Sequence, residues 1–553
     1  MRKKWNIREL SVRAKQLGNK YNLDPVVVQL LINREIDESE FLYFLNGTGY
    51  RAHSPDTLPD IGKASERITA AIKRKEKIVL FGDYDVDGLT SLAVFYDYIK
   101  DTAADFSFYV PHRIKEGFGL NRNALKMAKE GGAGLIISFD CGTNSYEEIE
   151  YASSLGIDTI VVDHHQPKTG RTPSYAFVNP KRKDSKYPFE YLSSAGVTFK
   201  LVQALKGRDC SHLLDLVALS IVCDVVPLRG ENRYLLKEGI KLLRTTQRPS
   251  INALCSISGL KQDNVDVFHI GYILGPRINA SGRVNTAYDA LNMFLSKDSS
   301  SALKYAKMLD EHNRLRRGIE SSVLKEAQDY VSADIEDNPV LVVYNEGWHH
   351  GILGIVASRL VDKYYRPAFV IGFNNGIGKG SARSIEGFNL MNALGHCENY
   401  LSGYGGHKKA AGIEILYKDV EGFRRIINEV ARNVLKPTDL LPGIDIDLEI
   451  MFSQINESLV SNIYNLKPFG EGNPQPLFIT RNVSIKQPPR KVTNGMYSIW
   501  VENSELTYEG VFFSRNNFSD IFNNGKSFDI VYSLEKNTYH NSIRLNIKDV
   551  HLG

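Results

Sequence analysis

Three aspartates stand at alternate positions in the sequence GDYDVDG (residues 82–88), directly after an apolar run at residues 78–81. The run is typical of a short buried strand, and alternate side chains of an extended chain lie on one face. Asp83, Asp85 and Asp87 can therefore point at one spot. Crowded carboxylates repel one another and are costly to bury unpaired, so a cation is expected between them. Oxygen ligands of this kind suit Mg²⁺ or Mn²⁺.

Two other interpretations of this segment are a calcium loop and a solvated acidic turn. The calcium-loop spacing D-x-D-x-D-G is present at Asp83, Asp85, Asp87 and Gly88. The twelfth position of such a loop falls near residues 93–95, where the sequence has no glutamate. The segment also follows a strand, whereas the calcium loop of an EF-hand follows a helix. These differences favour a catalytic metal site.

Further side chains that can bind metal follow other predicted strands. Asp140 follows an apolar run at residues 134–139, and His164 and His165 follow one at residues 158–162. Strands and helices alternate here, which predicts a parallel sheet covered by helices, with the site outside the carboxyl ends of the strands. A pair of histidines is more often one buried and one exposed ring without a role. Acidic groups at the neighbouring strand ends favour a metal ligand instead.

Asp224 closes an apolar helix at residues 213–223 and precedes the valines and proline that end it. A lone aspartate at a helix end is usually a surface group, but a carboxylate in apolar surroundings needs a partner. Two divalent ions, bridged by Asp140 or Asp87, could activate a water and clamp the oxygens of an in-line phosphoryl displacement. A histidine ligand favours Mn²⁺ somewhat over Mg²⁺. The predicted ligands are Asp83, Asp85, Asp87, Asp140, His164 and Asp224.

The composition of the 553-residue chain is that of an ordinary soluble multidomain protein. A formal net charge of +4 does not by itself imply a nucleic-acid partner. The five cysteines are far apart and form no CxxC pair, which argues against a disulfide framework or a zinc site and fits a reducing, cytoplasmic compartment. We expect neither a secretory signal nor a membrane span.

Four motifs occur in the order GDYDVDG, SFDCGT, VVDHH and CDVVPL, and in all four the chain resembles the DHH phosphoesterase superfamily. Later segments narrow the resemblance to the RecJ family of single-strand-specific 5′→3′ exonucleases: GPRINASGR at 275–283, GWHHGILGIVASRL at 347–360, GSARS at 380–384 and GYGGH at 403–407. The resemblance implies that the six predicted ligands bind two Mn²⁺ or Mg²⁺ ions and that His165 faces the substrate phosphate. Cys141 departs from the family pattern, which often has asparagine there, and its thiol is expected only to pack.

Basic and glycine-rich segments occur in the second half of the chain. Residues 275–283 are expected to form a glycine-punctuated loop whose arginines suit phosphate; a structural loop with solvated arginines is an equal alternative. The run at 376–381 differs from a phosphate loop, because glycine follows Lys379 where Ser or Thr is required, so an NTPase is excluded. The donors at 381–384 and 405–407 suit nucleotide phosphates instead. The resemblance implies that Arg113, Arg277, Ser381 and Arg383 hold the 5′ end and backbone and that His407 contacts the scissile region; Asn279, Arg283 and Gly406 complete the predicted substrate-binding set.

The expected fold is α/β, with a parallel-sheet DHH domain, a smaller α/β DHHA1 domain joined to it by a long helix, and a C-terminal β-barrel of OB type. We expect a helical extension packed on the first domain, five short barrel strands and an uninterrupted strand at 444–450. Basic and aromatic side chains of the barrel can track a single strand, although each aromatic could equally be a core residue; they are Arg481, Lys486, Arg490, Lys491, Tyr497 and Trp500. The expected domains are 1–50 (extension), 51–300 (DHH), 301–334 (linking helix), 335–435 (DHHA1) and 436–553 (barrel).

The expected function is that of a metal-dependent exonuclease that degrades single-stranded DNA from the 5′ end to mononucleotides. The resemblance implies a role in DNA repair and recombination, with a helicase and a single-strand-binding protein as partners, and we expect a monomer. Two alternatives remain. One is a phosphodiesterase of short oligoribonucleotides or cyclic dinucleotides, and the other is a non-catalytic replication scaffold of the same fold.

Overall fold

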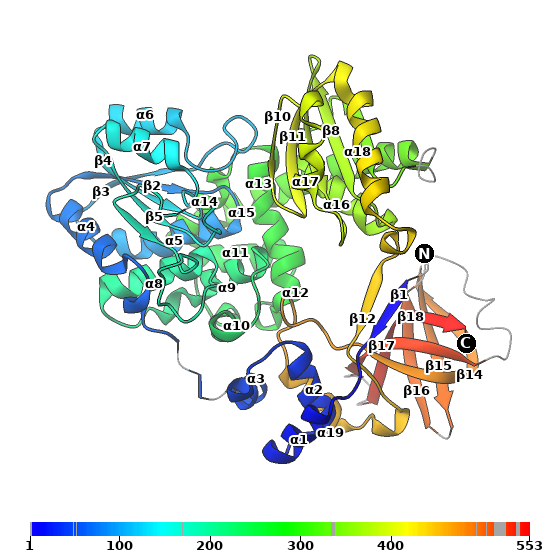
Figure 1. The fold of residues 1–553 in the computed structure, drawn as a ribbon. Coiled ribbons are helices and arrows are strands. Elements are labelled where there is room, and N and C mark those ends of the chain that lie inside the picture. Colours follow the sequence, from blue (N-terminus) through cyan, green and yellow to red (C-terminus); the bar gives the residue numbers. More distant parts are fainter. Residues whose placement is uncertain are drawn as a thin grey trace. The chain divides into compact units, whose positions relative to one another are not determined.

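The computed structural model describes two compact units (Figure 1). One comprises His53–Val226 and Leu235–Pro442, and the other comprises Met1–Ala52, Pro227–Tyr234 and Gly443–Gly553. Each unit is considered by itself. The structure describes residues 3–47, 49–50, 52–168, 170–332, 338–493, 495–504, 506–513, 527–537 and 542–552.

A parallel sheet in the order β3-β2-β4-β5-β6 forms the core of the first unit. Its strands end side by side: Gly82 of β2 pairs with Phe139 of β4, which pairs with Val162 of β5, which pairs with Val178 of β6. The residues that follow these strands therefore share one edge, as predicted. The strands are β2 (Lys77–Gly82), β3 (Asp105–Tyr109), β4 (Ala133–Phe139), β5 (Asp158–Val162) and β6 (Ala176–Val178).

Helices cover both faces of this sheet (Figure 1). Alternate strand residues such as Val79, Ile136 and Val161 pack against the helices α6 and α7, and α5, α8 and α4 pack on the other face. The apolar strands thus have no solvated side, as a parallel sheet requires. The bounds are α4 (Ile61–Lys73), α5 (Val86–Ile99), α6 (Arg122–Glu130), α7 (Tyr146–Ser154) and α8 (Ser194–Lys206).

Several helices follow the sheet along the chain, and one of them differs from what the sequence led us to expect. The segment 275–283, expected to be a loop, is helix α13. Pro276 is tolerated at the start of a helix because its fixed φ suits the first turn. Gly275 is needed for close approach, since a Cβ there would lie 2.4 Å from Sγ of Cys223. The helices are α9 (Leu214–Cys223), α10 (Gly230–Leu243), α11 (Pro249–Ile257), α12 (Val267–His269), η5 (Ile270–Leu274), α13 (Gly275–Val284), α14 (Tyr288–Leu295) and α15 (Ser299–Ser332).

The long helix α15 leads to a mixed sheet in the order β10-β11-β9-β8-β7. The run at 376–381, which looked like a glycine-rich loop, lies mostly in strand β9. Its glycines leave room for neighbours: a Cβ at Gly378 would lie 2.6 Å from Phe373, and one at Gly380 would lie 2.7 Å from Ile413. The elements are β7 (Leu341–Glu346), α16 (Leu353–Tyr364), β8 (Ala368–Asn374), β9 (Ile377–Arg383), α17 (Leu390–Gly395), β10 (Gly403–Gly406), β11 (Ala410–Leu416) and α18 (Val420–Val434).

The second unit is a barrel, which confirms the predicted C-terminal fold. Its strands run in the order β13-β14-β15-β16-β18-β17, and pairing of β14 with β17 closes it. Trp500 is 41% exposed, whereas Tyr497 packs against the core. The barrel strands are β13 (Leu448–Glu449), β14 (Phe478–Thr493), β15 (Met496–Asn503), β16 (Leu506–Phe513), β17 (Phe528–Asn537) and β18 (Ser542–Leu552), and β12 (Gly443–Ile446) precedes them in a separate two-stranded sheet.

The N-terminal extension corrects two expectations. It contains a strand, and it packs with the barrel, where we expected it on the first domain: β1 pairs with β12 in parallel, Lys4 opposite Gly443, and the apolar faces of its helices share the barrel core. The strand expected at 444–450 is correspondingly divided, because β12 pairs with β1 and β13 pairs with β14. The elements are β1 (Lys4–Ile7), α1 (Val12–Tyr21), α2 (Pro25–Asn33) and α3 (Phe41–Asn46), with α19 (Glu457–Asn465) beside them.

No helix among the described residues is both long and apolar enough to cross a membrane. The domain boundaries that we expected stay predictions.

Candidate metal centre

The turn after β2 positions the first three aspartates differently from the expected extended segment. Asp83 follows the strand, and Asp85 caps helix α5, where its Oδ1 accepts hydrogen bonds from the amides of Asp87 (2.9 Å) and Gly88 (3.2 Å). Asp87 lies in the first turn of that helix. Gly88 permits the tight turn, because a Cβ there would lie 2.4 Å from the carbonyl oxygen of Asp83. The three carboxylates therefore face two neighbouring spots.

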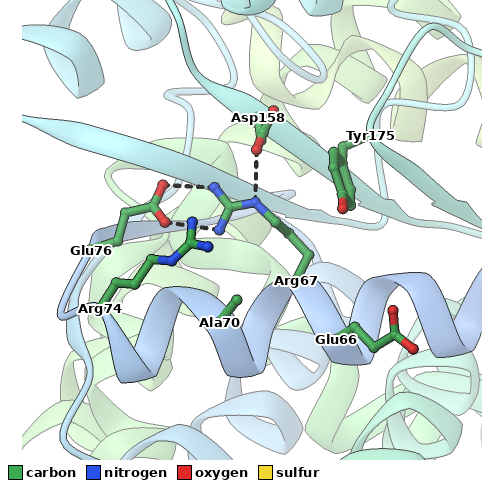
Figure 2. Close-up of a pocket in the computed structure, with 7 residues that line it drawn as sticks. All are labelled: Glu66, Arg67, Ala70, Arg74, Glu76, Asp158 and Tyr175. Atoms are coloured by element: carbon green, nitrogen blue, oxygen red, sulfur yellow. Dashed lines mark hydrogen bonds and ion pairs between the residues drawn. The ribbon is translucent and has the colours of Figure 1, made fainter.

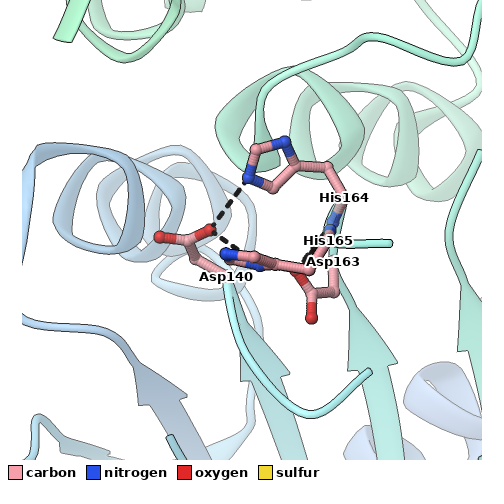
Figure 3. Close-up of side chains that lie close together, drawn as sticks. All are labelled: Asp140, Asp163, His164 and His165. Atoms are coloured by element: carbon pink, nitrogen blue, oxygen red, sulfur yellow. Dashed lines mark hydrogen bonds and ion pairs between the residues drawn. The ribbon is translucent and has the colours of Figure 1, made fainter. Parts of the chain in front are cut away.

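The edge of the sheet brings all six predicted ligands together. Side-chain atoms of Asp83, Asp85 and Asp140 lie within 4.8 Å of one another, as do those of Asp87, His164 and Asp224. Asp140 and His164 also belong to a third group with Asp163 and His165, and these four are drawn in Figure 3. The expectation that distant acidic segments would meet at one sheet edge is confirmed.

His164 lies close to carboxylates of both aspartate groups. Its Nε2 lies 3.4 Å from Oδ1 of Asp140, 3.4 Å from Oδ2 of Asp224 and 3.7 Å from Oδ2 of Asp87. Burial and the neighbouring charged His165 lower the pKa of His164 to about 3. The ring is thus neutral at pH 7 and can offer a nitrogen lone pair to a metal.

These residues fit divalent ions on the evidence of their own unsatisfied atoms. Within the described residues, Oδ1 of Asp83, Oδ1 of Asp140 and Nε2 of His164 are buried without a hydrogen-bond partner. Buried polar atoms normally have one, and burying a charge without compensation is costly. Burial and mutual repulsion raise the pKa values of Asp83, Asp140 and Asp224 well above the ordinary range. Positive charge between them would remove both penalties.

Asp87 is held rigidly. Its Oδ2 accepts a hydrogen bond from the amide of Ser194 (2.8 Å), and its Oδ1 accepts bonds from the amide of Ala195 (2.8 Å) and the hydroxyl of Ser220 (2.7 Å). The amides belong to the first turn of helix α8, whose dipole favours a carboxylate. Burial outweighs these bonds and raises the pKa of Asp87 to about 6.

Asp163 is a candidate site residue that the sequence reasoning missed. One of its oxygens accepts bonds from Nδ1 of His165 (2.7 Å) and from the amide of His164 (2.7 Å), and the other accepts a bond from the amide of Thr143 (3.0 Å). Although burial opposes it, the Asp163 carboxylate raises the pKa of His165 to about 9, so this ring is charged at pH 7. The sequence could have indicated Asp163, since it is the first residue of the DHH motif.

Several predicted substrate-binding residues gather beside the aspartates. The Arg113 guanidinium lies 4.9 Å from the ring centroid of Tyr84. Burial and Arg113 lower the pKa of both Arg283 (to about 9) and Arg383. Arg383 donates to the hydroxyl of Ser381 at 3.3 Å. The acidic site acts on this group at longer range: Arg113 interacts electrostatically with Asp83, and Arg283 interacts with Asp85.

Four other residues were predicted to bind substrate, and two of them, Arg277 and Asn279, contact other parts of the protein. Arg277 pairs with Asp310 at 3.0 Å, and Asn279 accepts a hydrogen bond from the amide of Val86 at 3.1 Å, which ties α13 to the aspartate turn. Gly406 ends β10, and a Cβ there would lie 2.3 Å from the carbonyl oxygen of Ala410. His407 follows it and is exposed. Their contacts with substrate stay predictions.

A hollow of this unit lies between helix α4 and residues near the opposite ends of the strands (Figure 2). Its central group, Arg67, is neutralised by Glu76 (2.7 Å) and by Asp158 (2.7 Å), which begins β5. The charge of Arg67 is therefore balanced by these two carboxylates and is not directed at a ligand. The carboxyl edge of the sheet is therefore the candidate site.

Comparisons with known proteins agree with this geometry. Family models match three parts of the chain: the N-terminal domain of the DHH family at residues 77–221, the DHHA1 domain at 337–433 and the RecJ OB domain at 446–549. The single-stranded-DNA-specific exonuclease RecJ of Bacillus subtilis is 36% identical over 99% of this chain and 70% of its own length. The protein of that name from Haemophilus influenzae is 31% identical over 84% of each chain.

Solved structures show the same fold. The structure of RecJ from Thermus thermophilus in complex with Mn²⁺ matches 100% of this chain and 80% of its own, with a TM-score of 0.84 and 23% identity. A structure of exonuclease RecJ bound to manganese matches 69% of this chain and 96% of its own, with a TM-score of 0.62 and 28% identity. Three matching family models, a relative that is 36% identical over 99% of this chain and a carboxylate–histidine site at the sheet edge establish that the chain belongs to the RecJ family.

Proposed function

We propose that the protein is a metal-dependent exonuclease that degrades single-stranded DNA in the 5′→3′ direction and releases mononucleotides, in DNA repair and recombination. The observation that carries the proposal is the adjoining set of buried carboxylate and imidazole groups whose atoms lack partners. The relatives from Bacillus subtilis and Haemophilus influenzae, 36% and 31% identical to this chain, are named as single-stranded-DNA-specific exonucleases, which supports the choice of substrate.

Two Mn²⁺ or Mg²⁺ ions would supply Lewis-acid activation of a water and of the phosphate oxygens at this site. Asp83, Asp85 and Asp140 would hold one ion, and Asp87, His164 and Asp224 would hold the other. Asp140 suits a bridging position, since it lies near both sets. The hydrogen bonds to Asp87 from α8 and Ser220 keep its carboxylate oriented before any ion binds.

His165 and the arginines act on the substrate in this proposal. The His165 side chain is 39% exposed and its Nδ1 lies 3.9 Å from Oδ1 of Asp140, so its charged ring can donate a hydrogen bond to a scissile phosphate oxygen. Arg113, Arg283 and Arg383 with the Ser381 hydroxyl would bind the phosphate at the 5′ end, because guanidinium groups match phosphate geometry. Arg277, Asn279, Gly406 and His407 complete the proposed contacts.

The barrel would grip the incoming strand. Trp500 is exposed on β15 and offers a face for base stacking. We keep the divisions at residues 50, 300, 334 and 435 as the proposed domain boundaries. A cytoplasmic monomer that works with a helicase and a single-strand-binding protein completes the proposal.

The test is Mn²⁺-dependent release of mononucleotides from 5′-labelled and 3′-labelled single strands. The proposal expects the 5′ label to leave first, a duplex to resist, and Asp140→Ala to abolish release. Faster cleavage of a dinucleotide or a short oligoribonucleotide than of a long strand would favour the small-substrate phosphodiesterase. Strand binding without any metal-dependent cleavage would favour the replication scaffold.

A further inference from the structure

The imidazole of His165, which the proposed function directs at the substrate, lies partly at the surface. Its side chain is 39% exposed, and the Phe118 ring that meets it edge-on, 5.6 Å away, is itself 56% exposed. Loose packing of this kind does not restrict a side chain to one rotamer, so hydrogen bonds have to set the direction of the ring. Its Nδ1 donates to Oδ1 of Asp163 at 2.7 Å (Figure 3). The other ring nitrogen, Nε2, is therefore the one that can donate to a phosphate oxygen.

Asn179 fixes the backbone of His165. It directly follows β6, as Asp163 directly follows β5, and it is 0% exposed. Nδ2 of Asn179 donates to the carbonyl oxygen of His165 at 2.9 Å, and its Oδ1 accepts a hydrogen bond from the amide of Lys181 at 2.8 Å. A reversed side-chain amide would place two oxygens against each other at His165, so the bond from Lys181 also fixes which way the amide faces.

Thr143 connects Asn179 to the aspartate that holds the His165 ring. Nδ2 of Asn179 donates to Oγ1 of Thr143 at 3.0 Å, and the amide of Thr143 donates to Oδ2 of Asp163 at 3.0 Å. The hydrogen bonds thus form a closed ring from Asn179 through Thr143, Asp163 and His165 back to Asn179. Thr143 and Asp163 are each 1% exposed. Such a ring is stiff, because opening any bond leaves a buried polar group unsatisfied.

The turn after β4 is shaped to bring Thr143 to this place. Gly142 has a φ of +108°, and a Cβ there would lie 3.1 Å from the side chain of Val161, so the chain folds back closely against β5. Asn144, next along the turn, donates to the carbonyl oxygen of Gln166 at 3.1 Å and accepts a bond from the amide of Lys168 at 2.9 Å. The turn therefore holds the histidine segment on both sides of His165.

We propose that Asn179 and Thr143 are positioning residues for His165 in the nuclease reaction. Their hydrogen bonds keep the imidazole beside Oδ1 of Asp140, 3.9 Å from its Nδ1. Neither residue belongs to the predicted metal ligands, so loosening the ring should misplace the imidazole and leave the ions bound. The inference rests on the proposed function, because only there does His165 act on the substrate. All of these residues lie in the stretch His53–Val226 of one unit.

The test compares single-turnover release of a 5′ label with Mn²⁺ affinity from calorimetry. Asn179→Ala removes both side-chain donors and should lower the rate by about tenfold or more, since a misplacement of about 1 Å can cost ~100-fold. Its Mn²⁺ affinity should stay within about twofold of the wild type. Thr143→Val keeps the shape of the side chain but loses the oxygen, and it should lower the rate in the same direction. Thr143→Ser keeps the hydroxyl and should restore most of the rate.

A second substitution shows whether Asn179 acts through His165. In a His165→Ala background the ring that Asn179 positions is gone, so adding Asn179→Ala should lower the remaining single-turnover rate by less than about twofold. An asparagine that only stabilises the fold would lower the rate to the same extent in both backgrounds. Enzyme in excess over the labelled strand keeps the slow rate of the His165→Ala proteins measurable.

The matched control is Asn428→Ala. Asn428 is 1% exposed in the same unit, accepts a hydrogen bond from the amide of Val340 at 2.9 Å and donates to the carbonyl oxygen of Arg424 at 3.0 Å. Its loss should lower the melting temperature and leave the rate unchanged.

Four results would each overturn the inference: an unchanged rate in folded Asn179→Ala, an equal loss in the His165→Ala background, an equal loss in Asn428→Ala, or a loss of Mn²⁺ affinity that accounts for the loss of rate. If Asn179→Ala does not fold, the two Thr143 variants decide, and equal rates in Thr143→Val and Thr143→Ser would overturn the inference. A wild type without Mn²⁺-dependent cleavage would overturn the proposed function and the inference together.

Discussion

Nε2 of His164 lies 3.4 Å from Oδ2 of Asp224, although β6, α8 and α9 separate the two residues along the chain. The pKa of the ring is lowered to about 3, so at neutral pH an uncharged nitrogen faces a carboxylate. Neither a salt bridge nor repulsion explains this contact. A cation bound between the two residues, with one ligand atom from each, would explain it. The pair is therefore the clearest sign of a metal site.

We expect Asp224→Asn to weaken Mn²⁺ binding and to lower the nuclease rate by at least ~100-fold. The substitution keeps the shape of the side chain and removes its charge, and even residues that only support a ligand cost up to this much. Calorimetry with Mn²⁺ and release of a 5′ label measure the two effects. Asp105→Asn, at an exposed position of β3, is the control and should change neither. A fully active Asp224→Asn protein would argue against the assignment.

Asp163→Asn should lower the pKa of His165 from about 9 towards its ordinary value, because the carboxylate is what stabilises the charged ring. At pH 8 most of the His165 rings would then be neutral. We therefore expect the nuclease rate of the variant to decline between pH 6.5 and 8, where the rate of the wild type does not follow this titration. Histidine NMR resonances report the pKa directly. An unshifted resonance would show that another group holds the charge.

Metal-free protein should lose thermal stability as the pH rises from about 6.5 to 9. The pKa of His165 is raised from 6.5 to about 9 in the folded state, which sets this pH range, and burial raises the pKa values of Asp83, Asp140 and Asp224 in the same direction. Folded protein then binds more protons than unfolded protein in this range, so the free energy of unfolding falls with increasing pH. Mn²⁺ should raise the melting temperature and make it depend less on pH, since the metal replaces the protons on the carboxylates. Melting curves with EDTA and with Mn²⁺ test this, and a stability that rises with pH in EDTA would contradict it.

Arg383→Ala should raise the KM for single-stranded DNA by about tenfold or more, since a hydrogen bond to a charged group contributes roughly 1.5–3 kcal/mol. Among the residues that the structure describes, its guanidinium donates only to Ser381 and to the carbonyl oxygen of Ala382, which leaves donors for phosphate. Arg366→Ala is the control: that side chain donates to the carbonyl oxygens of Tyr365 and Leu440, so its loss should lower stability and leave KM unchanged. An equal rise of KM in Arg383→Ala and Arg366→Ala would argue against a specific contact between Arg383 and the substrate.

Trp500→Ala should weaken binding of single-stranded DNA by about tenfold, because stacking on an aromatic side chain contributes roughly 1–3 kcal/mol per base. Fluorescence anisotropy without divalent ions measures affinity without cleavage. Trp5 provides a control of the same type: it stacks on His551 at 3.8 Å and donates to Asp549. Trp5→Ala should lower the melting temperature and leave the affinity for DNA unchanged. An unaltered affinity in Trp500→Ala would place the strand elsewhere on the barrel.

Local patterns in the sequence were enough to predict much of the site. Apolar runs that end in Asp140 or His164 identify strands whose carboxyl ends carry ligands, and alternation with helices requires these ends to meet at one edge. The barrel follows from short alternating strands in the same way. Each of these inferences depends on residues that are neighbours in sequence, which is why no tertiary information was needed.

Only the tertiary structure decided how the metal-binding side chains are divided into two sets and which contacts orient them. Asp87 faces His164 and not Asp83 because α5 begins at Val86, and its direction is set by Ser194 and Ser220 from elements distant in sequence. The glycines of α13 looked like turn residues, but in the fold Gly275 packs closely against Cys223 and Gly282 against Tyr84. The pairing of β1 with β12 and the burial of Arg233 against Phe44 likewise join segments that share no local pattern. Contacts of this kind depend on the surface that the folded chain presents, and a linear sequence does not display that surface.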